Sequence, residues 1–481
     1  MLKSTKDLRG RGVSPTPHPD ERSEEGSPEI LQPFGLQDDP SGRNSIEIPR
    51  GIKDFNQERL LEARKVGVIN LGCARNLVDS QTILGSLKRR GHRITADVAG
   101  ADMVVVNTCA FIEDAKRESI DTILDLIELK KQGKLKKIVV AGCLAQRYSK
   151  ELAKEFKEVD AILGVQKLDR ENIPAQVSLT PRHFAYVKIC ESCYNRCSFC
   201  VIPSIKGKFV SRSIESVVRE VKQLDARGVK EINIIGQDIT AYGMDIYREK
   251  ALARLLKEMV AVTKNIRWIR LLYAFPAHVT DELIEMIARE EKICKYIDIP
   301  LQHISDNVLR SMNRSITTRQ TMDLINKIRA QIPGAHIRTT FIVGLPGETQ
   351  ENFKELMDFV RATAFERVGA FVYSPEEGTP VYAMPGQVPD ATKRKRLNLL
   401  MALQQKISRG REREKIGRKL DVLIDEAQAG EESIYLGRTQ YDAHDVDGIV
   451  YVHSARKLTP GDLVPVEITD SYEYDLVGTA L

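Results

Sequence analysis

Three cysteines lie close together in the chain with the spacing CxxxCxxC, and their chemistry is specific. They are Cys193, Cys197 and Cys200. Three thiolates at this spacing can bind three irons of a four-iron cluster from one short loop, whereas an electron-transfer cluster normally takes four cysteines. The fourth iron then has no protein ligand. The spacing therefore predicts chemistry on a small molecule that binds at this iron.

Cys190 precedes this set and leaves an alternative open. Together with the CxxxCxxC cysteines it could form a four-cysteine site, as in a non-catalytic iron–sulfur carrier or electron-transfer protein. Cys294 is different, because it stands alone in the run Ile-Cys-Lys-Tyr. We expect Cys294 in a hydrophobic core, since free cysteine is among the most buried residue types.

Three further cysteines come earlier in the chain, each directly after an expected apolar strand. They are Cys73, Cys109 and Cys143. Apolar strands that alternate with helices predict a parallel sheet covered on both faces. In such sheets, ligands bind beyond the carboxyl ends of the strands. We therefore expect these three cysteines to gather into a second cluster site.

A second series of strands and helices follows a linker at 174–183. The expected strands are 184–189, 231–235, 267–272, 296–299, 337–343 and 367–373. Six such units predict an open, partial barrel with its site at the carboxyl ends of the strands. The CxxxCxxC run follows the first strand. A helix at 390–415 leads to residues 418–481, where alternating apolar and polar residues predict a small β-barrel.

The sequence predicts four parts: a tail at 1–60, an α/β domain at 64–175, a barrel core at 179–410 and a β-domain at 412–481. Nine acidic residues and seven prolines among the first fifty residues indicate a disordered tail rather than a transit peptide. No apolar run reaches the length of about eighteen residues that a membrane span needs. Eight cysteines without a secretory signal favour metal or redox use in a reducing, cytoplasmic compartment.

The layout resembles the methylthiotransferases of the radical S-adenosylmethionine superfamily from about residue 64 onward. That family has an amino-terminal cluster domain, a radical core and a TRAM domain in this order. Five runs resemble its RimO branch, which modifies an aspartate of the twelfth small-subunit ribosomal protein: Asn70–Ser80, Gly236–Gly243, Asp298–His303, Tyr373–Thr379 and Gly437–Asp442.

The alternative is a transfer-RNA methylthiotransferase, which usually has a basic pair where Glu376 and Glu377 stand here. Three positions depart from the family pattern. Ser192 stands where the family usually has Gly, Cys190 where a hydroxyl residue is common, and His444 where the RimO branch often has Pro. None of the three removes a cluster ligand.

The resemblance implies two [4Fe-4S] clusters and S-adenosylmethionine as cofactors. The cluster on the CxxxCxxC loop would bind S-adenosylmethionine and supply the electron that yields the 5′-deoxyadenosyl radical. The cluster on the three earlier cysteines would bind a sulfur that is methylated and transferred to the β-carbon of the substrate aspartate. An electron donor and a sulfur donor are implied as partners.

Two glycine-containing runs at expected strand ends could contact S-adenosylmethionine. Gly236, Gln237 and Asp238 could contact its methionine or ribose part. Gly344 and Pro346 lie in a run that opens a helix, whose free backbone N–H groups suit a polar ligand. Either run could instead be a plain strand–helix turn.

Charge is divided unevenly along a chain whose net charge is +5. The stretch 418–481 has thirteen acidic and five basic residues. A nucleic-acid-binding module should present a basic face. The acidic charge of this stretch therefore predicts that it does not bind nucleic acid directly and that its partner is a basic protein. An acidic surface that serves only solubility is the alternative. The acids expected to meet the partner are Glu431, Glu432, Asp445 and Asp447.

Overall fold

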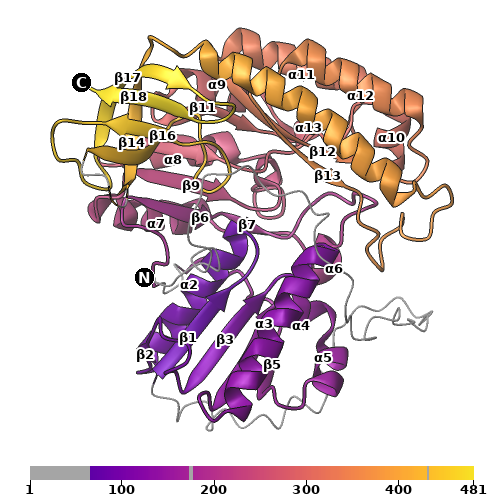
Figure 1. The fold of residues 1–481 in the computed structure, drawn as a ribbon, viewed down its shortest axis with the longest axis vertical. Coiled ribbons are helices and arrows are strands. Elements are labelled where there is room, and N and C mark those ends of the chain that lie inside the picture. Colours follow the sequence, from indigo (N-terminus) through magenta and orange to yellow (C-terminus); the bar gives the residue numbers. More distant parts are fainter. Residues whose placement is uncertain (1–64, 173–176, 429, 431–432) are drawn as a thin grey trace.

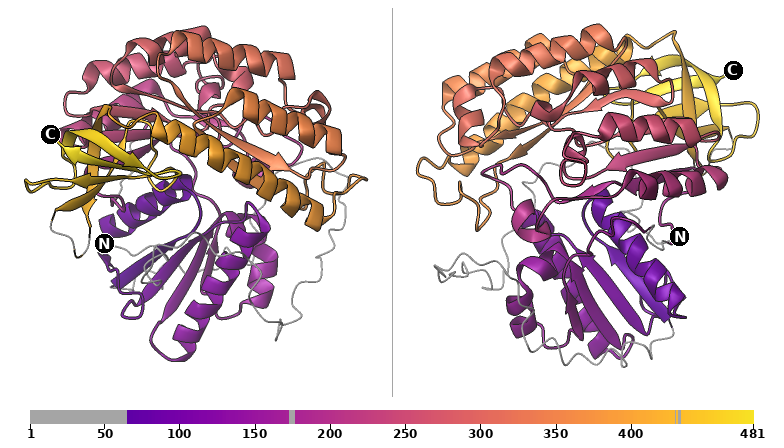
Figure 2. Two further views of the ribbon diagram at one scale, coloured as in Figure 1. Left: turned by 45° about the horizontal axis from the view of Figure 1, so that its top comes forward. Right: turned by 180° about the vertical axis from the view of Figure 1, so that it is seen from behind.

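The computed structural model describes residues 65–172, 177–428, 430 and 433–481 (Figure 1). It contains an amino-terminal α/β domain, a central open barrel and a closed five-stranded β-barrel packed beside the central sheet (Figure 2). The predicted fold class is confirmed. The predicted disordered tail at 1–60 lies outside the described residues. None of the described helices is both long and apolar enough to cross a membrane.

The amino-terminal domain has a parallel sheet in the order β2-β1-β3-β4-β5. Its strands are β1 Lys65–Asn70, β2 Arg93–Ile94, β3 Met103–Thr108, β4 Lys137–Gly142 and β5 Ala161–Leu163. Its helices are α2 Ala74–Arg89, α3 Glu113–Lys131, α4 Cys143–Arg147 and α5 Ser149–Glu155. Leu84 of α2 packs on one face of the sheet, and Ile123 of α3 packs on the other. This double cover explains the continuous apolar runs of β3 and β4.

The central sheet is parallel and open, in the order β13-β12-β11-β10-β9-β6. Its strands are β6 Phe184–Lys188, β9 Glu231–Ile235, β10 Trp268–Leu271, β11 Ile293–Asp298, β12 His336–Val343 and β13 Arg367–Val372. Its helices are α7 Ile214–Ala226, α8 Leu252–Val262, α9 Asp281–Arg289, α10 Asp306–Ser311, α11 Thr318–Gln331 and α12 Gln350–Thr363. Strand β11 begins earlier than predicted, because Ile293 and Cys294 are also buried. The prediction that Cys294 is a core residue is confirmed.

The two faces of the central sheet differ in polarity. On β9, Ile232 and Ile234 join the apolar core beneath the helices. The alternate residues Glu231 and Asn233 are buried polar residues outside that core, as expected when successive side chains point to opposite faces. Helix α2 contacts β6, so the amino-terminal domain approaches the open side of the sheet (Figure 1).

The carboxy-terminal domain is a closed barrel in the order β14-β15-β16-β18-β17. Its strands are β14 Lys419–Ala427, β15 Ile434–Thr439, β16 Val450–His453, β17 Leu463–Ser471 and β18 Leu476–Ala480. Helix α13, Asp390–Arg413, connects it to the central barrel. Arg438 forms an ion pair with Glu231 at 2.8 Å, and Arg367 forms one with Asp442 at 2.8 Å. These contacts fix the small barrel against the starts of the central strands.

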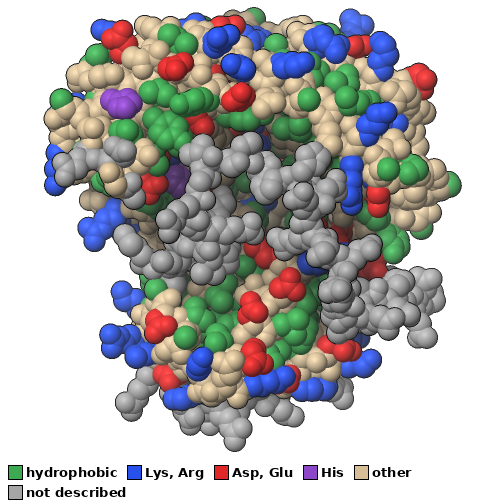
Figure 3. Space-filling model, in the orientation of Figure 1, with side chains coloured by type: hydrophobic (Ala, Val, Ile, Leu, Met, Phe, Trp, Pro, Cys, Tyr) green, Lys and Arg blue, Asp and Glu red, His purple; other side chains and the backbone are tan. Residues whose placement is uncertain are grey.

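Part of the acidic character of this domain is internal, which corrects one expectation. Asp447 is not a surface residue: its carboxylate accepts a hydrogen bond from the Tyr296 hydroxyl at 2.7 Å and is nearly inaccessible. Asp425 and Asp442 are likewise paired with arginines. Asp445 is exposed, and residues 431–432 lie outside the described part. On the face in Figure 3, acidic side chains are scattered over both the upper and the lower part of the molecule. The surface is therefore less acidic than the composition suggests.

Candidate active site

The six cysteines of the two expected clusters lie beyond the carboxyl ends of strands, where the amino-terminal domain meets the central barrel. Their thiols are free. Val201 and Ile205, which follow the CxxxCxxC run, pack into the core of the amino-terminal domain. The Arg75 guanidinium donates a hydrogen bond from Nη1 to the Gly236 carbonyl at 2.9 Å. Both kinds of contact bring the two cysteine sets to one domain junction.

Asn76 organises the loops that carry the amino-terminal cysteines. Its Nδ2 donates to the Leu71 and Thr108 carbonyls, both at 3.0 Å, and its Oδ1 lies 3.8 Å from the Cys143 sulfur. The side chain therefore connects the ends of β1, β3 and β4. Asn107 donates in turn to the Asn76 carbonyl at 2.8 Å. A buried and satisfied network of this kind holds its members rigidly.

Close backbone approach at these loops requires glycine at two positions. Gly72 has a φ of +87°, and a Cβ there would lie 2.8 Å from the Cβ of Cys109. Gly142 has a φ of +92°, and a Cβ there would lie 2.3 Å from Oδ1 of Asn107. Positive φ and lack of space both exclude other residues. The Ser119 hydroxyl and the Cys109 backbone form reciprocal hydrogen bonds, which fix Cys109.

The three amino-terminal thiols lie near one another but differ in acidity. Burial, joined by the neighbouring Cys109 and Cys73 sulfurs and opposed by Lys206, raises the pKa of Cys143 to about 12. Burial also raises the pKa of Cys109. At Cys73, burial raises the pKa, but the Arg75 charge and the Asn76 N–H outweigh it, so the pKa falls below its ordinary value.

The CxxxCxxC loop is supported by a two-strand hairpin and one short helix. The hairpin pairs β7, Cys190–Glu191, with β8, Val210–Ser211, and the helix is α6, Ile202–Lys206. The Asn195 amide donates to the Cys193 sulfur at 3.5 Å, and the Arg314 guanidinium donates to the Cys197 sulfur at 3.7 Å. Burial raises the pKa of Cys193 to about 11 and that of Cys200 to about 12.

Ser192 has the backbone conformation of the glycine that the family usually has. Its φ is +67°, in the left-handed region, which costs a residue with a Cβ about 1–2 kcal/mol. The Ser192 hydroxyl donates a hydrogen bond of 2.6 Å to the Gly207 carbonyl. This bond offsets part of the cost. His444, another departure, packs its ring against Phe184 at 4.3 Å between centroids.

Cys190 belongs to the barrel core rather than to the cysteine loop. Its side chain is fully buried among apolar residues, and its thiol donates to the Asp238 carbonyl at 3.6 Å. A Cβ on Gly236 would lie only 2.3 Å from the Cys190 sulfur. Burial raises the pKa of this thiol well above its ordinary value. This packing argues against the four-cysteine alternative.

The residues present fit a pair of three-cysteine clusters. In the described part of the chain, no group of three His, Cys, Asp or Glu side chains converges on one position for a single metal ion. A four-iron cluster does not need such convergence, because each thiolate binds a different iron. The six thiols are free, and amide and guanidinium N–H groups point at two of the loop sulfurs.

The predicted S-adenosylmethionine contacts at the end of β9 have protein partners. Gln237 donates to Glu191 at 2.8 Å, while its Oε1 is buried without a partner. Asp238 accepts from Asn195 at 2.8 Å and from the His278 ring at 2.8 Å. Its other oxygen accepts from the segment that follows it. Asp238 is therefore engaged in placing Asn195 near Cys193, whereas Gln237 retains an unused oxygen.

Part of the run after β12 uses its backbone N–H groups internally. Glu348 accepts hydrogen bonds from the backbone N–H groups of Gly344 at 2.6 Å and Leu345 at 3.2 Å. Thr349 then caps α12 by accepting from the Asn352 N–H. The donors of Gly344 and Leu345 are therefore satisfied within the run, and contact of Gly344 and Pro346 with S-adenosylmethionine stays a prediction.

Sequence reasoning missed a buried cluster of four charges beside the cysteines. Lys206 lies 3.1 Å from Asp79 and 3.4 Å from Glu191, and Lys188 pairs with the same two carboxylates. The cluster joins α2 to the start of the barrel and is electrically balanced. Asp79 and the bridging Arg75 are four residues apart in the run Asn70–Ser80, so helical spacing already placed them on one face.

Glu376 is also an interdomain contact. It is buried and lies 2.7 Å from Arg147 and 3.3 Å from Lys116, both in the amino-terminal domain. Arg147 also donates to the carbonyl of Glu377 at 2.8 Å. The acidic pair therefore helps to fix the amino-terminal domain on the barrel.

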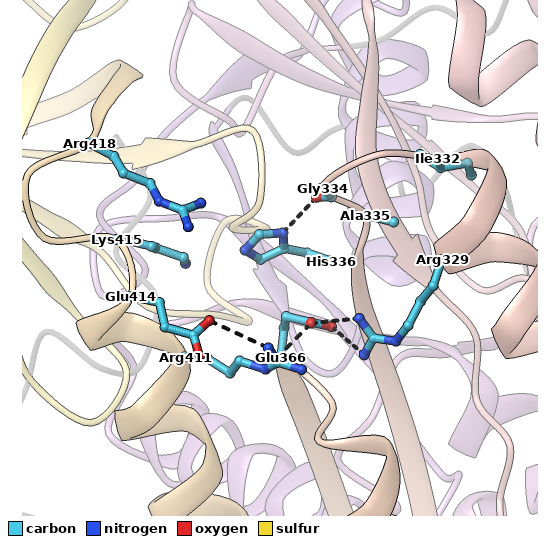
Figure 4. A pocket seen from close by; sticks show the side chains of 10 residues that line it. All are labelled: Arg329, Ile332, Gly334, Ala335, His336, Glu366, Arg411, Glu414, Lys415 and Arg418. Atoms are coloured by element: carbon cyan, nitrogen blue, oxygen red, sulfur yellow. Dashed lines mark hydrogen bonds and ion pairs between the residues drawn. The ribbon is translucent and has the colours of Figure 1, made fainter.

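A cavity of about 200 Å³ lies where β12 and β13 begin, at the opposite end of these strands from the cysteines, and Figure 4 shows the side chains that line it. It is lined by Arg329, Ile332, Gly334, Ala335, His336, Glu366, Arg411, Glu414, Lys415 and Arg418. Arg329 pairs with Glu366 at 3.0 Å, and Arg411 pairs with Glu414 at 3.4 Å. Because it adjoins the start of β12, and because Lys415 pairs with Glu412 of helix α13, we interpret it as a domain junction.

Three family models match the chain. They are the uncharacterized protein family UPF0004 over residues 65–164, the radical SAM superfamily over 187–360 and the TRAM domain over 416–481. The solved structure of TsrM from Kitasatospora setae, a radical S-adenosylmethionine methyltransferase with cobalamin and a [4Fe-4S] cluster bound, is similar with a TM-score of 0.50. It shares 17% identity and covers 66% of this chain and 77% of its own, which supports the fold alone. Together these matches define a radical SAM protein with a TRAM domain.

Relatives match over nearly their whole length. The ribosomal protein uS12 methylthiotransferase RimO of Clostridioides difficile is 44% identical over 442 residues, covering 87% of this chain and 99% of that protein. RimO of Caldanaerobacter subterraneus is 48% identical over 440 residues, covering 86% and 99%. The chain belongs to the RimO family of ribosomal protein uS12 methylthiotransferases.

Proposed function

We propose that this protein methylthiolates the β-carbon of an aspartate in ribosomal protein uS12, using two [4Fe-4S] clusters and S-adenosylmethionine. The observation that carries the proposal is the meeting of two three-cysteine sites at one domain junction, in a chain of the RimO family. Cys193, Cys197 and Cys200 would hold one cluster. The other would be held by the amino-terminal trio: Cys73, Cys109 and Cys143.

When bound, the two clusters and S-adenosylmethionine would supply the radical and the sulfur. The side chains of this protein hold the cysteine loops in position. The N–H groups of Asn195 and Arg314 point at the Cys193 and Cys197 sulfurs, and hydrogen bonds to cluster sulfurs tune the potential. The Asn76 network holds the other loops in register. The raised pKa values of Cys193, Cys200 and Cys143 mean that cluster binding releases protons from these thiols. Loading should therefore become easier as the pH rises.

Binding of S-adenosylmethionine would use the end of β9. The unpaired Oε1 of Gln237 and the backbone at Gly236 are the groups best placed for a polar ligand. Asp238 would act through Asn195 and His278, and Gly344 and Pro346 would shape the adjoining loop. Closing such a site against water protects a reactive intermediate.

The proposed partners follow from the same activity. The substrate would be the basic ribosomal protein uS12, met by the exposed acids of the TRAM domain, and an electron donor and a sulfur donor are required. We propose the cytoplasm as location, and 64–175, 179–410 and 412–481 as domain limits. The matched ranges 65–164, 187–360 and 416–481 support those limits.

Mass analysis of uS12 tests the proposal. A strain without this chain should yield uS12 lacking the mass of one methylthio group, and the wild-type gene should restore it. Cys73→Ala should abolish restoration, whereas Cys294→Ala, a core cysteine, should restore it. If uS12 is unchanged while transfer RNA loses a methylthio group, the proposed substrate is wrong.

A further inference from the structure

The cavity in Figure 4 has more positive than negative charge in its wall. It lies where the end of helix α13 and the start of the small barrel meet the start of β12. Four cationic and two acidic side chains line it: Arg329, Arg411, Lys415, Arg418, Glu366 and Glu414. A wall with this excess of positive charge disfavours a metal cation as ligand and favours an anion.

Arg418 differs from the other cations of the wall in having no carboxylate partner. The three other cations form the pairs Arg329–Glu366 at 3.0 Å, Arg411–Glu414 at 3.4 Å and Lys415–Glu412 at 2.9 Å. Among the described residues, no carboxylate lies within ion-pair distance of the Arg418 guanidinium. Its side chain is exposed, so its N–H groups can donate to a ligand in the cavity.

His336 presents a hydrogen-bond acceptor to the same space. Its Nδ1 lies 3.1 Å from the Gly334 carbonyl oxygen, which can only accept, so Nδ1 carries the proton. Burial and then the Lys415 charge lower the pKa of His336 to about 4, so the ring is neutral at pH 7 and its Nε2 accepts. The ring stacks on Tyr441, with centroids 3.8 Å apart. Figure 4 shows the ends of Arg418 and Lys415 directed toward this ring.

We propose that this cavity binds a hydrogenphosphate ion, with Arg418 and Lys415 donating to its charged oxygens and Nε2 of His336 accepting from its P–O–H group. Sulfate has no proton to donate at pH 7, so one of its oxygens would face the Nε2 lone pair. A phosphate monoester loses its last P–O–H proton at about pH 6. Inorganic phosphate keeps this proton and therefore matches both the donors and the acceptor.

The site is separate from the cysteines and does not depend on the proposed function. Its volume of about 200 Å³ accommodates a phosphate group, because a water molecule takes about 30 Å³ of the liquid. Arg418 directly precedes β14, and His336 is the first residue of β12. A bound hydrogenphosphate ion would therefore connect the carboxy-terminal barrel to the central barrel.

Isothermal titration calorimetry of the full chain with sodium phosphate, at pH 7 and constant ionic strength, tests the site. R418Q removes the unpaired charge. R413Q is the matched control, because Arg413 is an exposed residue of α13 that does not line the cavity. Phosphate should bind wild type and R413Q alike, and R418Q about tenfold more weakly, since a hydrogen bond from a charged group is lost. Equal affinities of R418Q and R413Q, or no binding to wild type, would overturn the proposal.

The choice of anion tests the acceptor on His336. Wild type should bind phosphate about fivefold more tightly than sulfate or glycerol phosphate, which is the effect of one neutral hydrogen bond. H336F keeps a ring against Tyr441 but lacks Nε2, so it should bind phosphate and sulfate equally. Equal binding of phosphate and sulfate by wild type, or a preference for phosphate that survives in H336F, would contradict the assigned acceptor. The comparison in wild type needs no substitution and therefore holds even if H336F does not fold.

Discussion

Adding one methyl group at Gly236 should disrupt the barrel, and deleting one sulfur should repair it. An alanine Cβ at position 236 would lie 2.3 Å from the Cys190 sulfur, while the next contact, Ile239 Cγ2, is an ordinary 3.4 Å. Neither side can move freely, because Arg75 holds the Gly236 carbonyl and Cys190 is fully buried. Overpacking of this kind costs about 1–3 kcal/mol and sometimes more, and we expect G236A at the upper end.

Cys190→Ala removes the atom that causes the clash. Alone it leaves a small cavity and should cost about 1–2 kcal/mol, less than the larger deletion in Leu→Ala. In the double variant, the methyl group that G236A introduces occupies the vacated space. The double variant should therefore be no less stable than C190A alone, so the coupling energy between these neighbours should equal the whole cost of G236A, about 3 kcal/mol.

Urea unfolding, followed by tryptophan fluorescence, measures the differences in unfolding free energy among these variants close to the substituted residues. The chain has one tryptophan, Trp268, which is buried on β10 beside β9. Its signal therefore reports on the barrel. If G236A alone unfolds like wild type, or if C190A fails to rescue it, the packing described for Cys190 is wrong. Retention of iron by C190A would also agree with its place in the core.

Three further outcomes follow from single contacts. Ser192→Gly removes left-handed strain but loses the bond to Gly207, so it should change stability by less than about 1 kcal/mol, whereas Ser192→Ala keeps the strain and should be about 1 kcal/mol less stable than the glycine variant in urea. Asp442 has an ordinary pKa of 3.8; burial raises it, but Arg367 and Lys415 outweigh burial and hold it at about 2 in the folded protein. Its stabilising effect is therefore complete above pH 3.8 and declines as the pH falls toward 2, and the urea midpoint of D442N should lack this part of the acid dependence. Glu376→Gln removes the carboxylate partner of Arg147, while Lys116 keeps Glu113 at 2.7 Å, and should weaken the domain contact by about 3 kcal/mol, seen as faster hydrogen exchange in α4.

For each of these three predictions, one result would contradict it. Ser192→Ala as stable as Ser192→Gly would contradict the assigned backbone strain. An acid dependence in D442N equal to that of wild type would place the titration elsewhere. Glu377→Gln is the control for Glu376, because Arg147 contacts residue 377 through its backbone carbonyl, which the substitution keeps. Equal exchange in the two variants would contradict the interdomain ion pair.

Strands formed by continuous apolar runs were predictable from the sequence. The apolar runs that end at Cys73, Cys109 and Cys143 indicated parallel strands, and the structure has β1, β3 and β4 there. The rule that ligands bind beyond the carboxyl ends of parallel strands then placed the three cysteines together. The order of strands in the barrel followed from chain order, because each crossover places the next strand beside the last.

Contacts between domains were not predictable, because they depend on how separate units pack. Composition counted Asp447 as a surface charge, yet it accepts a hydrogen bond from Tyr296 on a strand of another domain. The motif containing Glu376 indicated substrate choice, yet the side chain pairs with Arg147. At Gly344 the turn was predictable, but its donors are satisfied by Glu348, a residue of the same run. The sequence shows which residues are charged and where turns are expected. It does not show which groups form ion pairs or hydrogen bonds with them.

The central claim is that each cysteine trio holds its own cluster and leaves one iron open. Iron analysis with Mössbauer spectroscopy on anaerobically reconstituted protein tests it most directly. Wild type should contain about eight irons per chain in two four-iron clusters. Replacing either trio by alanine should leave about four, and the surviving cluster should have one iron that is not bound by cysteine. Four irons in wild type, or full cysteine ligation of every iron, would contradict the account.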